Sequence, residues 1–409
     1  MLASAEPQAR RFPVVPVPLP GYAIAPFVPL SLLSFPVACM IWIAALSAAA
    51  WATVVLMARL TQLPILALAT ALLPVDIGMS AMVGQVAPLV ILALVAAAAL
   101  LRADKDRSAA LVTSLAMLEP HIGVGACITL LVFRKGTRSV LLVGAIVAIL
   151  TTLITVGLHA TIEYAVAVVP AHALANATEA GQLSVTSLLW LAGMIPTDAV
   201  RYGEAMFVAM VLLGVVVAAR LAGTSGDSAY LVLTPPAFAM FGGVHVHISQ
   251  LIVAALPLLV LAAHRAPSRS ILTLAVIFLM LPWQLLLYPL LMLAGPLATT
   301  AFAISIRGSW RAFAAIVVPI GMIAGVVFLV WSGHAPHASF FVPREYPADS
   351  LVQVEWQDYV RAMYSSTDLL SLWLRVPNWV GAAIGLSVLT NAAFRGVRRF
   401  EAVEAKTRV

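Results

Sequence analysis

The sequence predicts an all-α fold, a polytopic transmembrane helical bundle with about 11 crossings and one re-entrant helical pair. Composition is the first observation behind this prediction. Of the 409 residues, 62% are hydrophobic and only 10% are charged, with a mean hydropathy of +1.04, far outside the range of soluble domains. The second observation is that basic residues gather in short segments between apolar stretches, as they do in cytoplasmic loops.

Apolar stretches bounded by charges set the order of the crossings. The chain is long enough for about a dozen passes of roughly 20 residues each. Every basic cluster from Arg59 onward falls on one side when the stretches are threaded in order, in agreement with the positive-inside rule. One apolar piece, Ser187–Ile195, is too short to cross. The predicted crossings are Val37–Met57, Leu63–Met82, Val86–Leu101, Val140–Leu158, Ala205–Ala219, Ala229–Met240, His247–Ala263, two within Ile271–Ser305, Ala312–Trp331 and Trp373–Phe394.

One stretch, Ser108 to Phe133, carries basic residues at both ends and Glu119-Pro120-His121 at its centre. Since basic loops are cytoplasmic, the chain is expected to enter and leave the membrane on the same side. Each apolar arm of about 12 residues makes roughly 18 Å of helix, whereas a crossing needs about 30 Å. An ionisable residue at such a buried tip is a functional hypothesis by default. The flanking basic residues are Arg102, Lys105, Arg107, Arg134, Lys135 and Arg138.

The composition of successive segments divides the chain into three regions. Residues 1–36, which are interrupted by prolines, are predicted to be an outer approach segment. Residues 37–394 form the membrane-embedded bundle, with outer loops at 159–186 and 332–370. Residues 395–409 form a basic cytoplasmic tail.

This threading places the N-terminus outside and the C-terminus in the cytoplasm. Arg10-Arg11 then lies outside with no preceding helix to export it, which conflicts with the positive-inside rule. Two explanations stay open. Either a span that precedes this segment is missing, or Gly21–Pro36 dips into the membrane and returns.

Charge and cysteine content exclude several other classes. The net charge of +6 lies mostly in short loops and in the tail, without the basic face and interleaved aromatic residues of a nucleic-acid binder. Cys39 and Cys127 both lie in apolar stretches, so they predict neither a disulfide framework nor a metal site. No cofactor is identified, and a divalent metal lacks a recognisable set of ligands.

Several landmarks occur in the order found in a known family. They are Tyr22, Pro26 and Pro29-Leu30 before the first crossing, Gly84-Gln85 opening a helix, Glu119-Pro120-His121 in the helical pair, Gln182-Leu183-Ser184 before a short helix, and Thr234-Pro235 followed by His245 and His247. In this order and topology the chain resembles bacterial integral-membrane mannosyltransferases of the glycosyltransferase C superfamily, which use polyprenyl-phosphate-mannose. The resemblance covers roughly residues 20 to 265.

The resemblance implies a multi-span enzyme of the bacterial plasma membrane. It would move a hexosyl group, mannose by analogy, from a polyprenyl-phosphate sugar to a lipid or glycan acceptor on the outer face. A carboxylate near that face would act as general base on the acceptor hydroxyl, and cations or hydrogen-bond donors would stabilise the leaving phosphate. The implied partners are the polyprenyl-linked donor, the acceptor and membrane lipids.

Two features depart from the pattern of that family. The family places its catalytic acid in a first outer loop, whereas Met1 to Gly21 holds a single acid, Glu6, which is better explained as a residue of a tail. Relatives usually have a lysine before the proline of the helical pair, where this chain has Glu119. Glu119 could be a base, a phosphate-site element acting through a metal, or a neutral acid that braces the helix break at Pro120.

Other candidates are assigned from their position in the threading. Asp76, late in an outward-going span, is the second candidate for the base, although helix-end capping or reaching toward the interface is a simpler explanation. His121 could donate to phosphate or satisfy carbonyls freed at the break. His245 and His247 could contact a lipid phosphate, form interfacial hydrogen bonds or bind a metal, for which no acid or cysteine completes the shell. Further predicted donor or sugar contacts are Tyr22, Gln85, Gln182 and Arg201.

Two other functions compete with the glycosyltransferase. A transporter or flippase would share the broken helices and the ionisable residues near the midplane, but no internal repeat relates the two halves of the chain. A glycosyltransferase-like protein that binds polyprenyl lipids without catalysis would explain the absence of the expected N-terminal acid.

Overall fold

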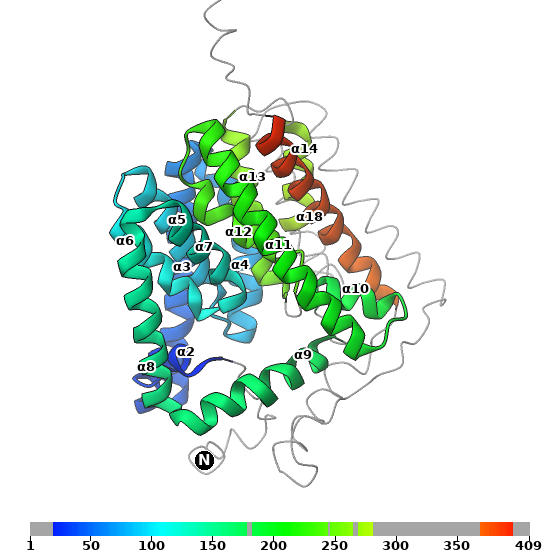
Figure 1. Cartoon of the computed structure of the whole chain (residues 1–409). Helices are drawn as coiled ribbons and strands as arrows, with labels where there is room; N and C mark the ends of the chain where they lie inside the picture. Colours follow the sequence, from blue (N-terminus) through cyan, green and yellow to red (C-terminus); the bar gives the residue numbers. More distant parts are fainter. Residues whose placement is uncertain (1–18, 178–181, 244–245, 265–268, 281–368, 396–409) are drawn as a thin grey trace, which may run out of the picture.

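The computed structural model describes residues 19–177, 182–243, 246–264, 269–280 and 369–395. In these segments every regular element is a helix, as predicted, and no strand occurs (Figure 1). The helices are α2 (Gly21–Ile24), α3 (Phe35–Thr61), α4 (Ile65–Val83), α5 (Ala87–Arg102), α6 (Asp106–Leu115), α7 (Pro120–Phe133), α8 (Arg138–Glu163), α9 (Val169–Ala177), α10 (Val185–Leu191), α11 (Pro196–Ser225), α12 (Tyr230–Ala239), α13 (Ile252–Ala263), α14 (Arg269–Met280) and α18 (Leu369–Arg395). Short 3-10 or π turns are η2 (Ala25–Phe27), η3 (Leu30–Leu32), η4 (Ala116–Leu118), η5 (Lys135–Thr137), η6 (Tyr164–Val168) and η7 (Ile248–Leu251).

Three helical stretches among the described residues are long and apolar enough to cross a membrane: Phe35–Thr61, Lys135–Leu174 and Pro196–Ser225. The first of them, α3, has Pro36 in its first turn, where proline needs no backbone donor. It ends at Thr61, and the next residue, Gln62, has left-handed backbone angles. The helix contains the predicted crossing Val37–Met57, and this agreement arises because its apolar run is uninterrupted.

The short helix α12 lies at the centre of the bundle and packs against α7, α11 and α13. Every residue from Tyr230 to Ala239 is buried. Glycines make the close packing around it feasible, because a Cβ atom at Gly214 would lie 2.9 Å from the Pro235 Cα and one at Gly125 would lie 3.0 Å from the Pro235 Cβ. Small residues at helix contacts are the usual way for membrane helices to approach each other closely.

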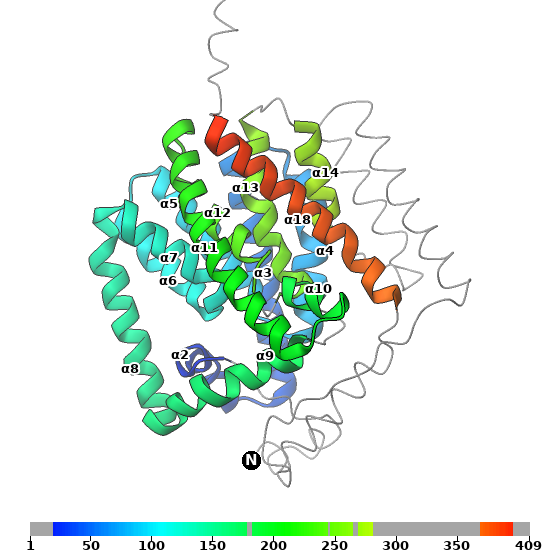
Figure 2. The same cartoon turned by 45° about the vertical axis from the view of Figure 1, so that its right-hand side comes forward.

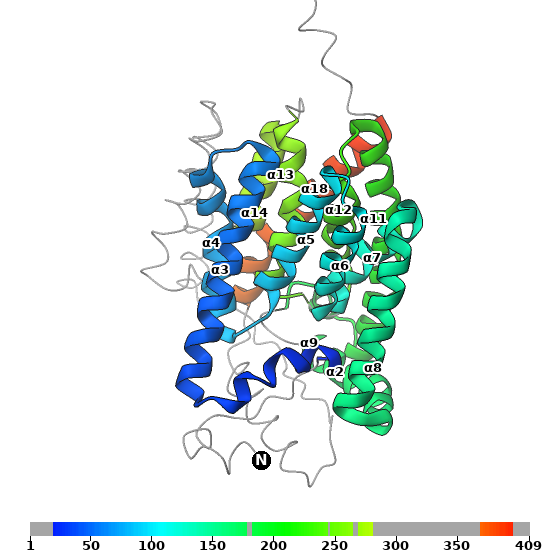
Figure 3. The same ribbon diagram turned by 90° about the vertical axis from the view of Figure 1, so that its left-hand side faces the viewer.

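The predicted helical pair is a hairpin in the structure. Helix α6 runs toward the tip, η4 turns the chain, and α7 returns from Pro120 (Figure 3). Its two ends are side by side, since the Arg134 Nε lies 3.7 Å from the Asp106 Oδ1. Gly123 allows the two arms to touch near the tip, where an added Cβ would lie 2.6 Å from the Ala116 carbonyl. The hairpin confirms that the chain enters and leaves at one end of the bundle.

The ends of the helices define an upper and a lower end of the bundle in the orientation of Figure 1. Helices α3, α5, α11 and α13 finish at the upper end, and α4, α6 and α12 finish toward the lower end (Figures 1 and 3). The upper end carries the basic residues that the sequence assigns to the cytoplasm. Which end faces the cytoplasm stays a prediction.

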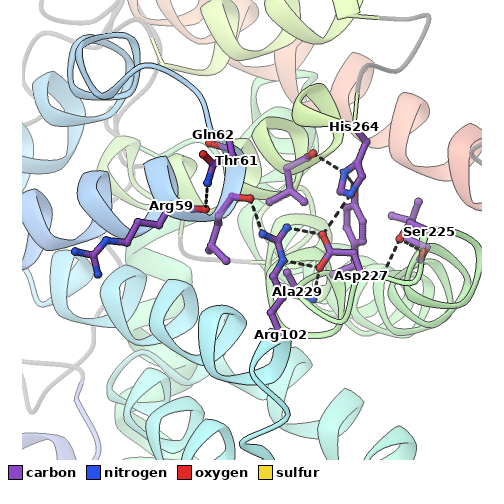
Figure 4. A network of polar contacts seen from close by, with 12 residues as sticks. Arg59, Thr61, Gln62, Arg102, Ser225, Asp227, Ala229 and His264 are labelled. Atoms are coloured by element: carbon purple, nitrogen blue, oxygen red, sulfur yellow. Dashed lines mark hydrogen bonds and ion pairs between the residues drawn. The ribbon is translucent and has the colours of Figure 1, made fainter. Parts of the chain in front are cut away.

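A closed set of polar contacts joins four helix ends at the upper end (Figure 4). The Arg102 Nε and Nη2 donate to the two carboxylate oxygens of Asp227 at 2.8 and 2.5 Å, and its Nη1 donates to the Leu60 carbonyl at 2.5 Å. The His264 Nε2 lies 3.7 Å from the same carboxylate, and the Tyr230 hydroxyl lies 3.5 Å from the His264 Nδ1. We call these five residues the upper cluster.

The structure corrects the predicted loop at 159–186, most of which is helical. Helix α8 continues to Glu163 and is followed by the π turn η6 and by α9. A break at Gly157, with φ 81° and ψ 167°, redirects the chain so that it passes beneath the bundle (Figure 1). Only glycine adopts such angles readily. Alanine is the best helix former, and Ala160, Ala165 and Ala167 follow the break, so the chain continues as helix beyond it.

Two further elements differ in extent from the predictions or fall partly outside them. Helix α11 begins at Pro196, well before the predicted Ala205–Ala219, so Asp198, Arg201 and Glu204 lie in its first turns. The approach Gly21–Pro36 consists largely of short helices. Outside the described residues lie Glu6, Arg10-Arg11, the crossing Ala312–Trp331, the part of Ile271–Ser305 beyond Met280, the outer loop up to residue 368, and the tail from residue 396.

Candidate functional site

The connection between α12 and α13 forms the centre of the candidate site. Two glycines bring it against α11. A Cβ atom at Gly242 would lie 2.7 Å from the Phe207 Cα, and Gly243, with φ +106°, donates its backbone N–H to the Gly203 carbonyl at 3.1 Å. The segment Val246–Gln250 that follows contacts residues from four distant parts of the chain. We call this segment the central loop.

Gln250 links the central loop to the tip of the helical hairpin. Its Nε2 donates to the Glu119 Oε2 at 2.8 Å, and it also interacts with the His121 side chain. The His121 Nε2 lies 3.8 Å from the same Glu119 oxygen. Glu119 is buried and caps α7, because its carbonyl accepts the N–H groups of Ile122 and Gly123 at 2.9 and 3.0 Å. These contacts favour the interpretation of Glu119 as an acid that braces the helix break.

His247 is the half-buried member of the central loop. Its side chain accepts the backbone N–H of Gln250, and its own N–H donates to the Gln250 Oε1 at 2.9 Å, so the two residues form a capping box for η7. His121 and His172 both interact electrostatically with His247. His121 from α7 and His172 from α9 therefore both lie near His247, and the side chain of His121 is 26% exposed.

The two predicted sugar-binding glutamines hold the central loop in place instead of facing an open space. Gln182 is fully buried, and its Oε1 accepts the N–H of Val246. The adjoining Leu183 N–H donates to the Val246 carbonyl at 2.8 Å. The hydroxyl of Ser249 donates to the Gln85 Oε1. Both glutamines thus belong to the site, as anchors of its loop.

Tyr22 attaches the approach segment to the hairpin tip. Its hydroxyl donates to the Met117 carbonyl at 2.6 Å, and its backbone N–H donates to the Thr152 Oγ1 at 3.1 Å. Burial raises the pKa of the Tyr22 hydroxyl above its ordinary value, so the group stays protonated and keeps donating. Tyr22 fixes the chain two residues before Glu119, which is an indirect contribution to the site.

Asp76 is fully buried, at 0% exposure, inside α4 and not at its end. This position contradicts both simpler explanations, helix-end capping and reaching toward the interface. Neither carboxylate oxygen has a hydrogen-bond partner among the described residues. Helix α4 packs against η7, so Asp76 belongs to an element that borders the central loop. A buried acid without a partner is costly, which keeps Asp76 as a functional candidate.

Two predicted phosphate contacts are not part of the assembled site. Arg201 projects from the first turns of α11 with 82% of its side chain exposed, and its Nη1 lies 4.0 Å from the Asp198 Oδ1. The prediction that Arg201 contacts the donor finds no support in this position. His245 lies outside the described residues.

Sequence reasoning missed Gln250 and His172. His172 is a single polar residue in an apolar stretch, and Gln250 follows His247 by three residues and Ser249 directly, which are the signals that could have identified them. No group of three or more His, Cys, Asp or Glu side chains suited to a metal occurs in the part of the chain that the structure describes. The described site is therefore built from carboxyl, amide and imidazole groups.

Comparison with known families decides the class of this site. Residues 20–246, more than half of the 409, match the model of glycosyltransferase family 87. The chain belongs to glycosyltransferase family 87. This is a family of membrane glycosyltransferases. Searches of curated proteins and of solved structures find no significant match to the chain.

The family 87 match has a boundary that bears on the site. It includes Tyr22, Gln85, Glu119 and Gln182, and it ends at Val246, the first residue of the central loop. Gln250 and α18 lie beyond it. The site of this family 87 member thus combines the matched segment with the following segments of the chain.

Proposed function

We propose that this chain transfers a mannosyl group from polyprenyl-phosphate-mannose to a lipid or glycan acceptor on the outer face of a bacterial plasma membrane. Membership of family 87 supports a transferase over a transporter or flippase. The observation that carries the proposal is the convergence on the central loop of the hairpin tip and of three histidines. Such a polar assembly within an apolar bundle suits a polar headgroup attached to a lipid tail.

The reaction defines what the side chains must do. An acceptor oxygen forms a bond to the anomeric carbon, the bond from that carbon to the phosphate oxygen breaks, and the polyprenyl phosphate leaves with both electrons of that bond. The acceptor proton passes to a base. Imidazole donors from His121 and His247 would stabilise the charge that develops on the phosphate. Both side chains are partly exposed at the central loop.

The choice between the two candidate bases follows from their partners. Glu119 accepts a hydrogen bond from Gln250 and is committed to bracing the hairpin tip. The carboxylate of Asp76 accepts no hydrogen bond from the described residues. In this proposal Asp76 is the base and Glu119 positions His121 through their 3.8 Å contact. The third reading, a lipid-binding protein without catalysis, predicts that loss of Asp76 has no effect on any reaction.

The test uses membranes from cells that express the full chain. Labelled polyprenyl-phosphate-mannose is added, and lipid and glycan fractions are separated to follow the label. Transfer that depends on the chain, and that falls in a His247→Ala variant, supports the proposal. Binding of the labelled lipid without transfer would favour the non-catalytic reading. Absence of both, with uptake of a small solute, would favour a transporter.

A further inference from the structure

Helix α18 presents a polar stripe to the core just where it meets the lower end of the bundle. Asn378 and Trp379 follow Arg375 by three and four residues, which places both on the same face of the helix as Arg375. Arg375 and Asn378 are each 1% exposed. Farther along, the same face carries only apolar residues such as Ala382 and Leu389. The polar residues are therefore confined to the first half of the helix.

Trp379 connects this stripe to the candidate site. Its Nε1 donates to the Leu183 carbonyl at 2.9 Å, and the Leu183 N–H donates to the Val246 carbonyl at 2.8 Å. Two hydrogen bonds thus lead from α18 to the central loop. Arg375 lies about 6 Å closer to the start of the helix than Trp379, by the rise of one turn. Figures 1 and 2 both show the start of α18 next to α10, which follows Leu183 directly.

Arg375 is the one arginine or lysine that is buried among the described residues. A guanidinium group stays charged in proteins, so it cannot escape the cost of burial by losing a proton. Buried charges are retained where they meet an opposite charge. Arg375 has interactions of its own in the structure, and a guanidinium has five N–H donors in a geometry that suits phosphate. Arg375 is positively charged, unlike Glu119, and it is buried, unlike Arg201.

Asn378 supplies a second and independent observation. Its Nδ2 donates to the Phe278 and Leu279 carbonyls at 3.1 Å each, in the last turn of α14. Since carbonyls only accept, this pairing fixes the orientation of the amide. The Oδ1 then faces elsewhere, and it is a buried acceptor without a hydrogen bond from any residue in the described segments. A sugar hydroxyl is a donor that would satisfy it.

We propose that Arg375 and Asn378 form the half of the donor site that the family 87 match does not reach. The Arg375 guanidinium binds the phosphate of the polyprenyl-linked sugar, and the Asn378 Oδ1 accepts a hydrogen bond from a hydroxyl of the attached sugar. This inference rests on the proposed function for the identity of the ligand. It adds a cation on α18 to the histidines of the central loop, so that the phosphate is held from two sides.

Binding measurements on the purified full chain in lipid nanodiscs test the proposal. Wild type and Arg375→Gln are compared for affinity to polyprenyl phosphate and to the uncharged polyprenol. We expect Arg375→Gln to bind polyprenyl phosphate about 10- to 100-fold more weakly, as for loss of a charge-assisted contact, and to bind polyprenol unchanged. If Arg375 had only a structural role, Arg375→Gln would lower the affinity for both ligands. Equal discrimination in the variant and the wild type would overturn the assignment of Arg375.

Asn378→Leu is tested with a second ratio, the affinity for polyprenyl-phosphate-mannose over that for sugar-free polyprenyl phosphate. We expect the preference for the mannosyl lipid to fall about fivefold, the worth of one neutral hydrogen bond. An unchanged preference would overturn the sugar contact. Arg201→Gln is the matched control, because it removes an exposed arginine from the same end of the bundle. It should change neither ratio.

A measurement on the wild type covers the case in which Arg375→Gln does not fold. A photoreactive polyprenyl phosphate, with the reactive group beside the phosphate, is cross-linked and the labelled peptides are identified. Label on the first half of α18 supports the proposal, and label confined to other segments overturns it. These readouts need no transfer. If the chain transfers mannose and Arg375→Gln still prefers polyprenyl phosphate over polyprenol as the wild type does, this inference alone is rejected. If polyprenyl phosphate binds at α18 but no transfer occurs, the proposed function alone is rejected.

Discussion

The two ends of the bundle handle buried polar groups in opposite ways. At the upper end, the Asp227 carboxylate accepts two hydrogen bonds from Arg102, and His264 lies beside it (Figure 4). At the lower end, Glu119 meets an amide and an imidazole, and Asp76 meets no hydrogen-bond donor among the described residues. The upper end therefore satisfies its charges internally, and the lower end leaves capacity for a ligand.

The difference has a basis in where the residues sit. Arg102 lies in the last turn of α5, where the helix dipole favours a positive charge. Its partner Asp227 lies just beyond the end of α11. The contacts of the upper cluster join helix ends to one another, and they are complete without a bound molecule. Glu119 and Asp76 instead sit at a helix break and within a helix that contains Pro74. We infer that the upper cluster stabilises the fold and that the lower end carries the chemistry.

The largest expected effect concerns which end faces the cytoplasm. Ala103→Cys places a thiol beside the upper cluster, and Thr197→Cys places one at the lower end, both at exposed positions. In intact cells, a membrane-impermeant thiol reagent should label Thr197→Cys and leave Ala103→Cys unlabelled until the cells are opened. The native Cys39 and Cys127 are replaced first as a control. Reversed labelling would invert the whole threading.

The second expected effect separates the lower acid from the upper one. Asp76→Asn should reduce transfer about 100- to 10,000-fold if Asp76 takes the acceptor proton. Its thermal unfolding temperature should stay the same or rise, because the change removes a buried charge that has no described partner. Initial rates of mannosyl transfer and unfolding curves measure the two quantities. A variant with normal transfer would exclude Asp76 as the base.

The matched change at the upper end should show the reverse pattern. Asp227→Asn leaves the Arg102 guanidinium without its carboxylate, which should lower the free energy of unfolding by about 3 kcal/mol, the low end for broken buried pairs, since Arg102 is partly exposed. Transfer per folded molecule should stay unchanged. Chemical unfolding and active-site titration check this. Recovery of stability in Arg102→Gln/Asp227→Asn is the control, and a selective loss of transfer would contradict the structural role.

The smallest expected effect is at Glu119. In Glu119→Gln the side chain still offers a carbonyl oxygen to the Gln250 amide, so the tip should keep its shape. Loss of the charge should cost about 1 kcal/mol of that contact and lower transfer about fivefold. Rates across Glu119→Gln, Glu119→Ala and wild type measure the trend. If Glu119→Gln is as inactive as Asp76→Asn, Glu119 has a direct part in the chemistry.

Much of the fold follows from hydropathy and charge. The helical pair, α3 and α5 agree with the predicted segments because each is an apolar run with charge or proline at its ends. The error at 159–186 has a physical source. A few polar residues and one glycine suggested a loop, but the backbone is helical on both sides of Gly157, which only changes its direction.

The site was accessible to sequence reasoning only in part. Glu119, His121 and His247 stood out because polar residues in apolar stretches are rare, and the structure brings them to one place. Gln250, which joins them, passed unnoticed inside a predicted crossing. Arg201 looked suitable by charge and by predicted side, yet its side chain is exposed. Burial and partner, the properties that decide these roles, depend on packing between distant segments.

The amino-acid sequence by itself determined the membrane class, the helical pair with its buried acid, and the order of the motifs, because apolar length and charge act locally along the chain. Only the tertiary structure decided which polar residues meet. Glu119 and Gln250 are 131 residues apart, and Trp379 and Leu183 are 196 apart. Such contacts arise from helix packing around α12, and no local pattern along the chain specifies them.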